Sequence, residues 1–147
     1  MTGATESEVR VYVDSSALIK RSLEETESDA LEAAFDRYVA DDAVIVASSL
    51  AWIEVSRALR TWLDRGSYDE DQVHDAVEGA LSGVAERLIT GDVVGLARRI
   101  GPPLLRTLDA VHLATAILLD VDVVVAYDAR LVDACRQNGL NVTTPGQ

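Results

Sequence analysis

Four acidic residues adjoin apolar segments of the chain, where carboxylates are uncommon unless they have a partner. Asp14 and Asp128 each follow an apolar run, and Glu54 and Asp109 lie within apolar stretches. An ionised carboxylate beside a protein core costs free energy unless it is paired or bound to a cation. Several carboxylate oxygens that converge on one point would bind a hard divalent cation, Mg²⁺ or Mn²⁺, which prefers oxygen ligands and retains water.

Each acid also has a purely structural explanation. Asp14 and Asp109 could cap a helix or lie in its first turn, where a negative charge complements the helix dipole. Asp128 could be a turn residue, and Glu54 could pair with Arg57 one helical turn along. The residues alone leave both interpretations open, but the structural one does not explain why four acids each adjoin a core segment.

Short apolar runs alternate with helical patterns along the chain. Strands are predicted at 9–13, 43–47, 87–89, 121–126 and 140–143. Helices are predicted at 17–21, 27–40, 48–65, 69–84, 92–100, 108–119 and 129–138, with a break at 101–103. Strands that are apolar throughout, separated by helices, indicate a parallel sheet covered on both faces. The sequence therefore predicts an α/β fold, a three-layer α/β/α sandwich with a central, mainly parallel sheet.

Such sheets bind ligands beyond the carboxyl ends of their strands, near a topological switch point. Asp14 and Asp128 both follow predicted strands, so we expect them to face one crevice. The apolar stripe of the helix that carries Glu54 comprises Ala51, Val55, Ala58, Leu59 and Trp62. Glu54 falls roughly 60° from the centre of this stripe, beside the core.

Composition limits the classes of function. The net charge of −12 repels nucleic acid at long range, so any contact with a polyphosphate must come from local basic patches and bound cations. The longest apolar runs are far shorter than the roughly 18 residues of a membrane span. Residues 1–10 lack a secretory signal, which predicts a soluble, cytoplasmic protein. Cys135 is the only cysteine, which excludes an intramolecular disulfide and a multi-cysteine zinc site and suggests a buried helix residue.

Four segments, in order, resemble the motifs of the PIN-domain family. Segment 11–18, VYVDSSAL, resembles the opening signature, and segment 48–59, which contains Glu54, resembles the second acidic helix. Segment 105–114, LRTLDAVHLA, is very close to the third motif, and segment 124–131, VVAYDARL, resembles the fourth. Any one motif is weak, but the ordered set extends over nearly the whole chain. We therefore expect a single PIN-like domain over 1–147, with its core at about 9–143.

The resemblance implies a Mg²⁺-dependent ribonuclease of the VapC type, the toxin of a VapBC toxin–antitoxin pair. By that resemblance Asp14, Glu54, Asp109 and Asp128 bind the metal, with Mn²⁺ as a substitute, and Ser15 helps to orient the site. It also implies an RNA substrate, a cognate antitoxin and a homodimer. Independently of the resemblance, Arg106 precedes Asp109 by one helical turn, so we expect it to hold that carboxylate or to contact phosphate.

Other interpretations lose a required residue or explain less. A phosphatase that forms an aspartyl-phosphate would need an acid where Ser16 stands, and a receiver domain would need a lysine late in the chain, whereas the only lysine is Lys20. The remaining alternative is an inactive PIN-like module that binds protein or RNA. His112, Trp52 and Trp62 are predicted to pack in the core or at an interface.

Overall fold

The computed structural model describes residues 8–64 and 69–147. The strands are β1 (Arg10–Val13), β2 (Val44–Ser48), β3 (Ala85–Arg87), β4 (Val123–Val125) and β5 (Val142–Thr143). The helices are α1 (Ser15–Ile19), α2 (Ser28–Ala40), α3 (Ser49–Asp64), α4 (Glu70–Leu81), α5 (Gly91–Ala97), α6 (Thr107–Leu118) and α7 (Ala129–Gln137). The predicted end of the helix 48–65, at Arg65, lies outside the described residues.

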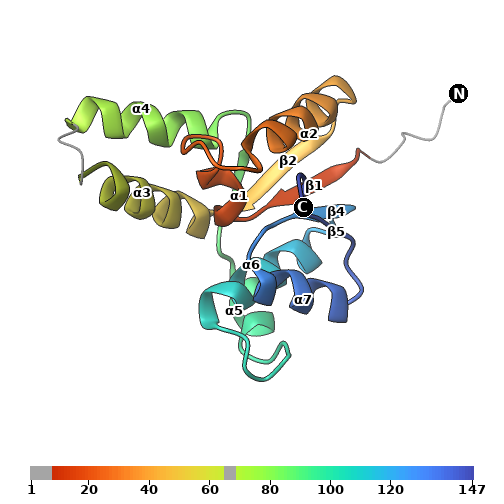
Figure 1. The fold of residues 1–147 in the computed structure, drawn as a ribbon. Helices are drawn as coiled ribbons and strands as arrows, with labels where there is room; N and C mark the ends of the chain where they lie inside the picture. Colours follow the sequence, from red (N-terminus) through yellow and green to blue (C-terminus); the bar gives the residue numbers. More distant parts are fainter. Residues whose placement is uncertain (1–7, 65–68) are drawn as a thin grey trace, which may run out of the picture.

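The strands form one sheet in the order β3-β2-β1-β4-β5, and each pair of neighbours is parallel. Helices α1 to α4 cover one face of this sheet and α5 to α7 cover the other (Figure 1). The predicted three-layer α/β/α sandwich with a parallel sheet is therefore confirmed. The chain moves outward from β1 to β3 and then returns to the opposite side of β1, so the switch point lies between β1 and β4.

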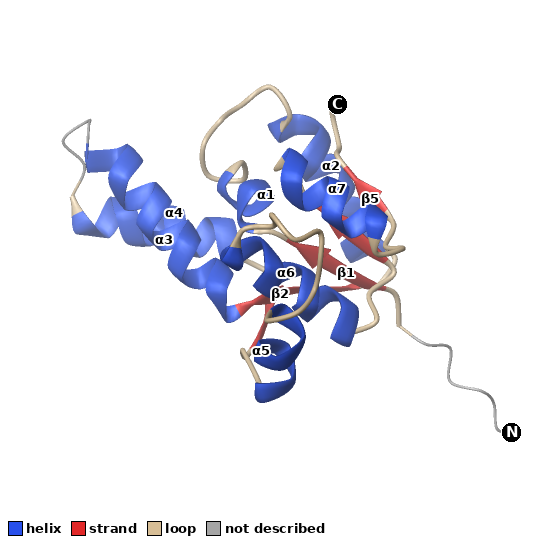
Figure 2. Cartoon of the chain, turned by 90° about the horizontal axis from the view of Figure 1, so that it is seen from below, coloured by secondary structure: helices blue, strands red, loops and turns tan. Residues whose placement is uncertain are grey.

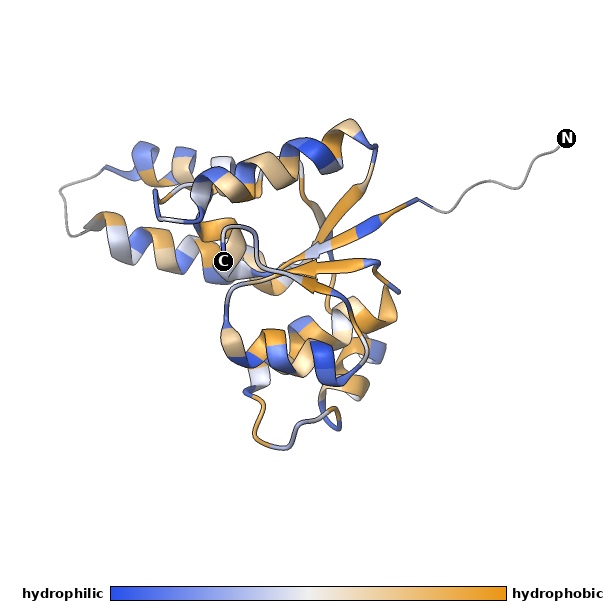
Figure 3. Cartoon of the chain, turned by 45° about the vertical axis from the view of Figure 1, so that its right-hand side comes forward, coloured by the Kyte–Doolittle hydropathy of each residue, from blue (hydrophilic) through white to orange (hydrophobic). Residues whose placement is uncertain are grey.

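Alternate residues of the central strand serve two cores. Val11 and Val13 pack with α1, α2 and α3, whereas Tyr12 packs with α6 and α7. All three side chains are fully buried, and the central strands β1, β2 and β4 are mainly apolar (Figure 3). A strand buried on both faces has no polar side to expose. Cys135, on α7, belongs to the second core, and the prediction of a buried helix residue is confirmed.

Helices α3 and α4 lie side by side and extend beyond the edge of the sheet (Figure 2). Asp69 begins α4 with a capping box, in which its side chain accepts from the backbone of Gln72 and the Gln72 side chain accepts in return. The helix ends three residues before the predicted position 84, because Gly83 adopts a φ of +77° that a helix cannot continue. Local chemistry thus sets both ends of this helix.

The third strand and Trp62 also depart from the prediction. The third strand lies at Ala85–Arg87 instead of 87–89, because its register with β2 pairs Ala85 with Val46 and leaves Leu88 and Ile89 exposed. Trp62 is 56% exposed, so it does not belong to the apolar stripe of α3, which continues to Leu63 instead. No helix in the described part of the chain is both long enough and apolar enough to cross a membrane.

Candidate active site

Asp14 follows β1 directly, and its backbone N–H donates to the carbonyl of Val125 at the end of β4. The side chain caps α1 by accepting from Ala17 N at 3.0 Å, and Ser16 Oγ lies 2.7 and 2.8 Å from its two oxygens. Asp14 is only 3% exposed. Burial raises the pKa of its carboxyl group to about 6, although the hydrogen bond from Ser16 opposes this rise. The switch point of the sheet therefore holds a buried carboxylate.

Asp128 approaches the same switch point from the end of β4. Its Oδ1 caps α7 by accepting from the backbone N–H groups of Arg130 and Leu131, and the residue is exposed. Its charge also contributes to the raised pKa of Asp14. Asp14 thus caps a helix, as its structural explanation predicted, and Asp128 is also a helix cap, where a turn residue was predicted. The charge of Asp128 nevertheless acts on Asp14.

Asp109 lies in the first turn of α6 and is partly buried. Burial raises its pKa, and the charges of Asp128 and Glu54 raise it further. The guanidinium of Arg106 opposes this rise from a distance, but no ion pair joins Arg106 to Asp109 within the described ranges. The expected ion pair between these two side chains is absent there, and Arg106 is the exposed N-cap residue of α6.

Glu54 lies on the part of α3 that faces α1 and α6. Its Oε1 accepts from Ser15 Oγ at 2.6 Å and lies 2.6 Å from His112 Nε2. Burial raises the pKa of this carboxyl group, but the hydrogen bonds from His112 and Ser15 outweigh it, and the pKa lies below its ordinary value. Glu54 does not pair with Arg57 among the residues that the structure describes.

The four acids form one electrostatic cluster. Asp14 interacts with Asp128, and Asp109 interacts with both Asp128 and Glu54. Within residues 8–64 and 69–147, however, no three Asp, Glu, His or Cys side chains form a group with the geometry to hold a metal ion. The cluster has the oxygen donors that Mg²⁺ prefers, held at the expected edge of the sheet. Its donors fit a hard divalent cation by chemistry and charge, and the side chains that supply them are Asp14, Glu54, Asp109 and Asp128.

Ser16, His112 and Tyr12 also contribute to the site, although none of them was predicted as a site residue. Ser16 holds Asp14 and also accepts from the backbone N–H of Tyr127, which ties the first acid to the loop after β4. His112 is buried, as predicted for a core residue, but it also bonds Glu54 and Tyr12. The position of Ser16, two residues after Asp14 at a helix start, was the one available signal.

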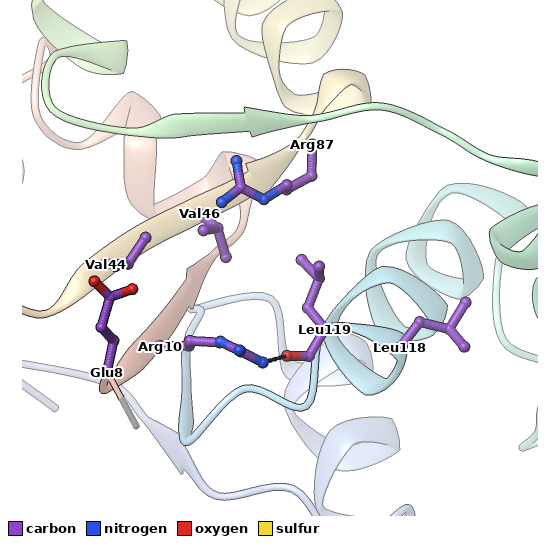
Figure 4. A pocket seen from close by; sticks show the side chains of 7 residues that line it. All are labelled: Glu8, Arg10, Val44, Val46, Arg87, Leu118 and Leu119. Atoms are coloured by element: carbon purple, nitrogen blue, oxygen red, sulfur yellow. Dashed lines mark hydrogen bonds between the residues drawn. The ribbon is translucent and has the colours of Figure 1, made fainter. Parts of the chain in front are cut away.

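A hollow of about 300 Å³ lies elsewhere, on the α6 side of the sheet toward the amino ends of the strands (Figure 4). Its lining includes Arg10, Val44 and Arg87 and none of the four acids. The guanidinium of Arg10 donates to the carbonyl of Leu119 at 2.7 Å, at the carboxyl end of α6. Arg10 therefore complements a helix terminus, and the hollow is separate from the acidic cluster.

Known proteins share both the sequence and the fold. The chain matches the PIN domain family over residues 11–137. It is 40% identical to Ribonuclease VapC46 of Mycobacterium tuberculosis over 137 residues, which cover 92% of this chain and 97% of the relative. Ribonuclease VapC47 of the same species is 32% identical over 138 residues, which cover 92% and 97% of the two chains.

Solved structures are similar at lower identity. A chain of VapBC2 from Rickettsia felis, bound to a DNA fragment from its promoter, superposes with a TM-score of 0.72 at 11% identity and covers 92% of this chain and 98% of that one. The Mycobacterium tuberculosis toxin VapC20, which cleaves the sarcin–ricin loop, gives a TM-score of 0.61 at 18% identity over 84% and 94% of the two chains. The structures support the fold and the sequence relatives support the family: the chain belongs to the PIN-domain family, among the VapC ribonucleases.

Proposed function

We propose that this chain is a divalent-metal-dependent endoribonuclease that cleaves RNA in the cytoplasm. The observation that carries the proposal is the carboxylate of Asp14, which is 3% exposed and has no cationic partner among the described residues. Fold stability alone does not favour such a group, because an unpaired buried charge is costly. Asp128 and Asp109 add negative charge nearby and increase that cost.

The side chains of the site have separable tasks. Asp14, held by Ser16 and Ala17, is the central ligand of the cation, and Glu54, held by Ser15, is the ligand on the α3 side. The chemistry supplied by bound Mg²⁺ is neutralisation of the scissile phosphate and activation of a water for in-line attack. The protein contributes fixed carboxylates, which an RNA backbone approaches only when a cation reverses their charge.

Purified protein provides a direct test. Cleavage of single-stranded RNA should stop when EDTA removes divalent ions and return when Mg²⁺ or Mn²⁺ is added in excess. Isothermal titration of the protein with MnCl₂, without RNA, should show saturable binding. Cleavage that persists in EDTA would contradict metal dependence. Absence of Mn²⁺ binding together with absence of cleavage would favour the inactive binding module.

We further propose that the chain is the toxin of a toxin–antitoxin pair and forms a homodimer. The similarity to a VapBC structure supports an antitoxin partner. Large apolar side chains that are exposed in the first half of the chain, Val39, Ile53 and Trp62, offer area for protein contacts. Sedimentation at micromolar concentration should show a species of twice the chain mass of 15.8 kDa. A species of the single-chain mass alone would contradict the dimer.

A further inference from the structure

A chain of hydrogen bonds runs from the central strand to Glu54. Tyr12 Oη, on β1, lies 2.6 Å from His112 Nδ1, on α6, and His112 Nε2 lies 2.6 Å from Glu54 Oε1, on α3. Tyr12 is fully buried and His112 is 3% exposed. The edge of the tyrosine ring meets the imidazole, with the centroids 5.8 Å apart and the planes at 72°. Three elements that are distant in sequence thus meet through one imidazole.

The direction of each hydrogen bond follows from its partners. The backbone N–H of Ser48 donates to Tyr12 Oη at 3.2 Å, so the hydroxyl accepts there and its proton is available to His112 Nδ1. Glu54 Oε1 already accepts from Ser15 Oγ, and a carboxylate oxygen has no proton to give, so His112 Nε2 carries the proton of this hydrogen bond. This pattern of donors places a proton on Nε2 and leaves Nδ1 to accept from the Tyr12 hydroxyl. No buried side-chain nitrogen or oxygen lacks a partner within residues 8–64 and 69–147.

We propose that Tyr12 and His112 are positioning residues that orient Glu54 for the cation. Both hydrogen bonds to Glu54, from His112 and from Ser15, end on Oε1. Within the described part of the chain Oε2 has no hydrogen bond, so it is the oxygen available as a ligand. Tyr12 fixes the imidazole, the imidazole fixes the carboxylate, and the carboxylate presents one defined oxygen. This inference rests on the proposed metal-dependent function.

The test is isothermal titration with MnCl₂ of the wild type, Tyr12→Phe and Thr115→Val. Tyr12→Phe removes one buried hydroxyl from the network and should weaken Mn²⁺ binding roughly 10- to 100-fold. Thr115→Val is the matched control, because Thr115 is 2% exposed, lies one turn along α6 from His112, and its hydroxyl donates to the carbonyl of Val111. Its Mn²⁺ affinity should equal that of the wild type.

Two further measurements separate positioning from simple packing. In ¹⁵N NMR spectra of the metal-free wild type, His112 should show a protonated Nε2 and an unprotonated Nδ1, and Tyr12→Phe should show a mixture of tautomers. His112→Gln, whose amide can still donate to Glu54, should retain more Mn²⁺ affinity than His112→Leu. A structural role alone would not rank these two variants by their hydrogen-bonding capacity.

The outcomes distinguish failure of the metal-dependent function from failure of the positioning role of Tyr12 and His112. If the wild type does not bind Mn²⁺, the metal-dependent function fails, and the positioning role fails with it. If the wild type binds Mn²⁺ but Tyr12→Phe binds equally well, or loses no more affinity than Thr115→Val, only the positioning role is overturned. Should Tyr12→Phe not fold, the wild-type spectrum still decides, because a proton on Nδ1 of His112 would contradict the network.

Discussion

Charged side chains are exposed at the amino ends of the strands, whereas a carboxylate is buried at the carboxyl ends. At the amino ends, the backbone N–H of Arg10 donates to Asp122 Oδ2 at 2.8 Å, and the guanidinium of Arg10 donates to the carbonyl of Leu119. Both charged residues are exposed. At the carboxyl ends, Asp14 is buried and receives its hydrogen bonds from Ser16 and the backbone, not from a cation.

This difference distinguishes charged groups that serve only the fold from charged groups that favour the binding of a ligand. Exposed, hydrogen-bonded charges cost little and contribute little, so those at the amino ends need only a structural explanation. The carboxyl-end cluster costs free energy, because burial and neighbouring acids both disfavour ionisation of Asp14 and Asp109. A cost of this kind is typical of a site that awaits a counter-charge. Substitutions at the two ends should therefore change the free energy of unfolding by different amounts and in opposite directions.

The largest effect should come from Asp14→Asn. This change keeps the size of the side chain and the oxygen that caps α1, but it removes the central negative charge of the site. RNA cleavage in Mg²⁺ should fall by roughly 10³-fold or more, because a bound metal supplies several kcal/mol of transition-state stabilisation. The matched control is Asp122→Asn, at the opposite end of the sheet, which should cleave at the wild-type rate. A fully active Asp14→Asn variant would refute the site.

Asp14→Asn should also stabilise the metal-free protein at neutral pH. The carboxyl group titrates near 3.8 in the unfolded chain and near 6 in the folded one, so the folded state binds more protons between these values. Ionisation of Asp14 therefore reduces stability as the pH rises, and a difference of about two pKa units corresponds to about 3 kcal/mol.

Urea unfolding in EDTA between pH 3 and pH 8 measures this effect. The asparagine variant should be more stable than the wild type by up to about 3 kcal/mol above pH 6, and the difference should vanish below pH 4. A difference that stays constant across this range would show that ionisation of Asp14 is not its source.

Ser16→Ala should have an intermediate effect. It removes the hydroxyl that holds the Asp14 carboxylate and leaves the backbone N–H of Tyr127 without that acceptor. Metal affinity should fall roughly 10- to 100-fold. Ser22→Ala is the control, because Ser22, in the turn after α1, donates through Oγ to the carbonyl of Ala76 on α4, away from the acids. Titration with MnCl₂ should separate the two variants, and equal affinities would contradict the role of Ser16.

Arg10→Met should have the smallest effect. It removes an exposed hydrogen bond at the carboxyl end of α6 and keeps an unbranched apolar stem. The free energy of unfolding should fall by about 0.5 to 1 kcal/mol, as for other surface charges near a helix end. Cleavage and Mn²⁺ affinity should not change. If Arg10→Met lost cleavage, the charges at the amino ends of the strands would not be purely structural.

Much of the fold follows from local patterns. The apolar run before Asp14 and the one before Asp128 form parallel strands because neither has a polar face. Gly139, with a φ of +81°, closes α7 where the sequence predicted its end. The third strand was misplaced because Leu88 and Ile89 are apolar, and pairing with β2, not hydropathy, selected Ala85–Arg87. Edge strands carry the weakest pattern, since only one neighbour constrains them.

The four acids, and the strand ends that carry Asp14 and Asp128, can be identified from the chain alone, because residue type and the order of apolar runs are properties of the sequence. How those acids are held depends on the packing of the folded protein. Tyr12, His112 and Glu54 come from three elements, and their contacts join positions up to 100 residues apart. No local pattern encodes such a contact, because a hydrogen bond between distant segments depends on how the sheet and helices pack and not on the neighbours of either residue.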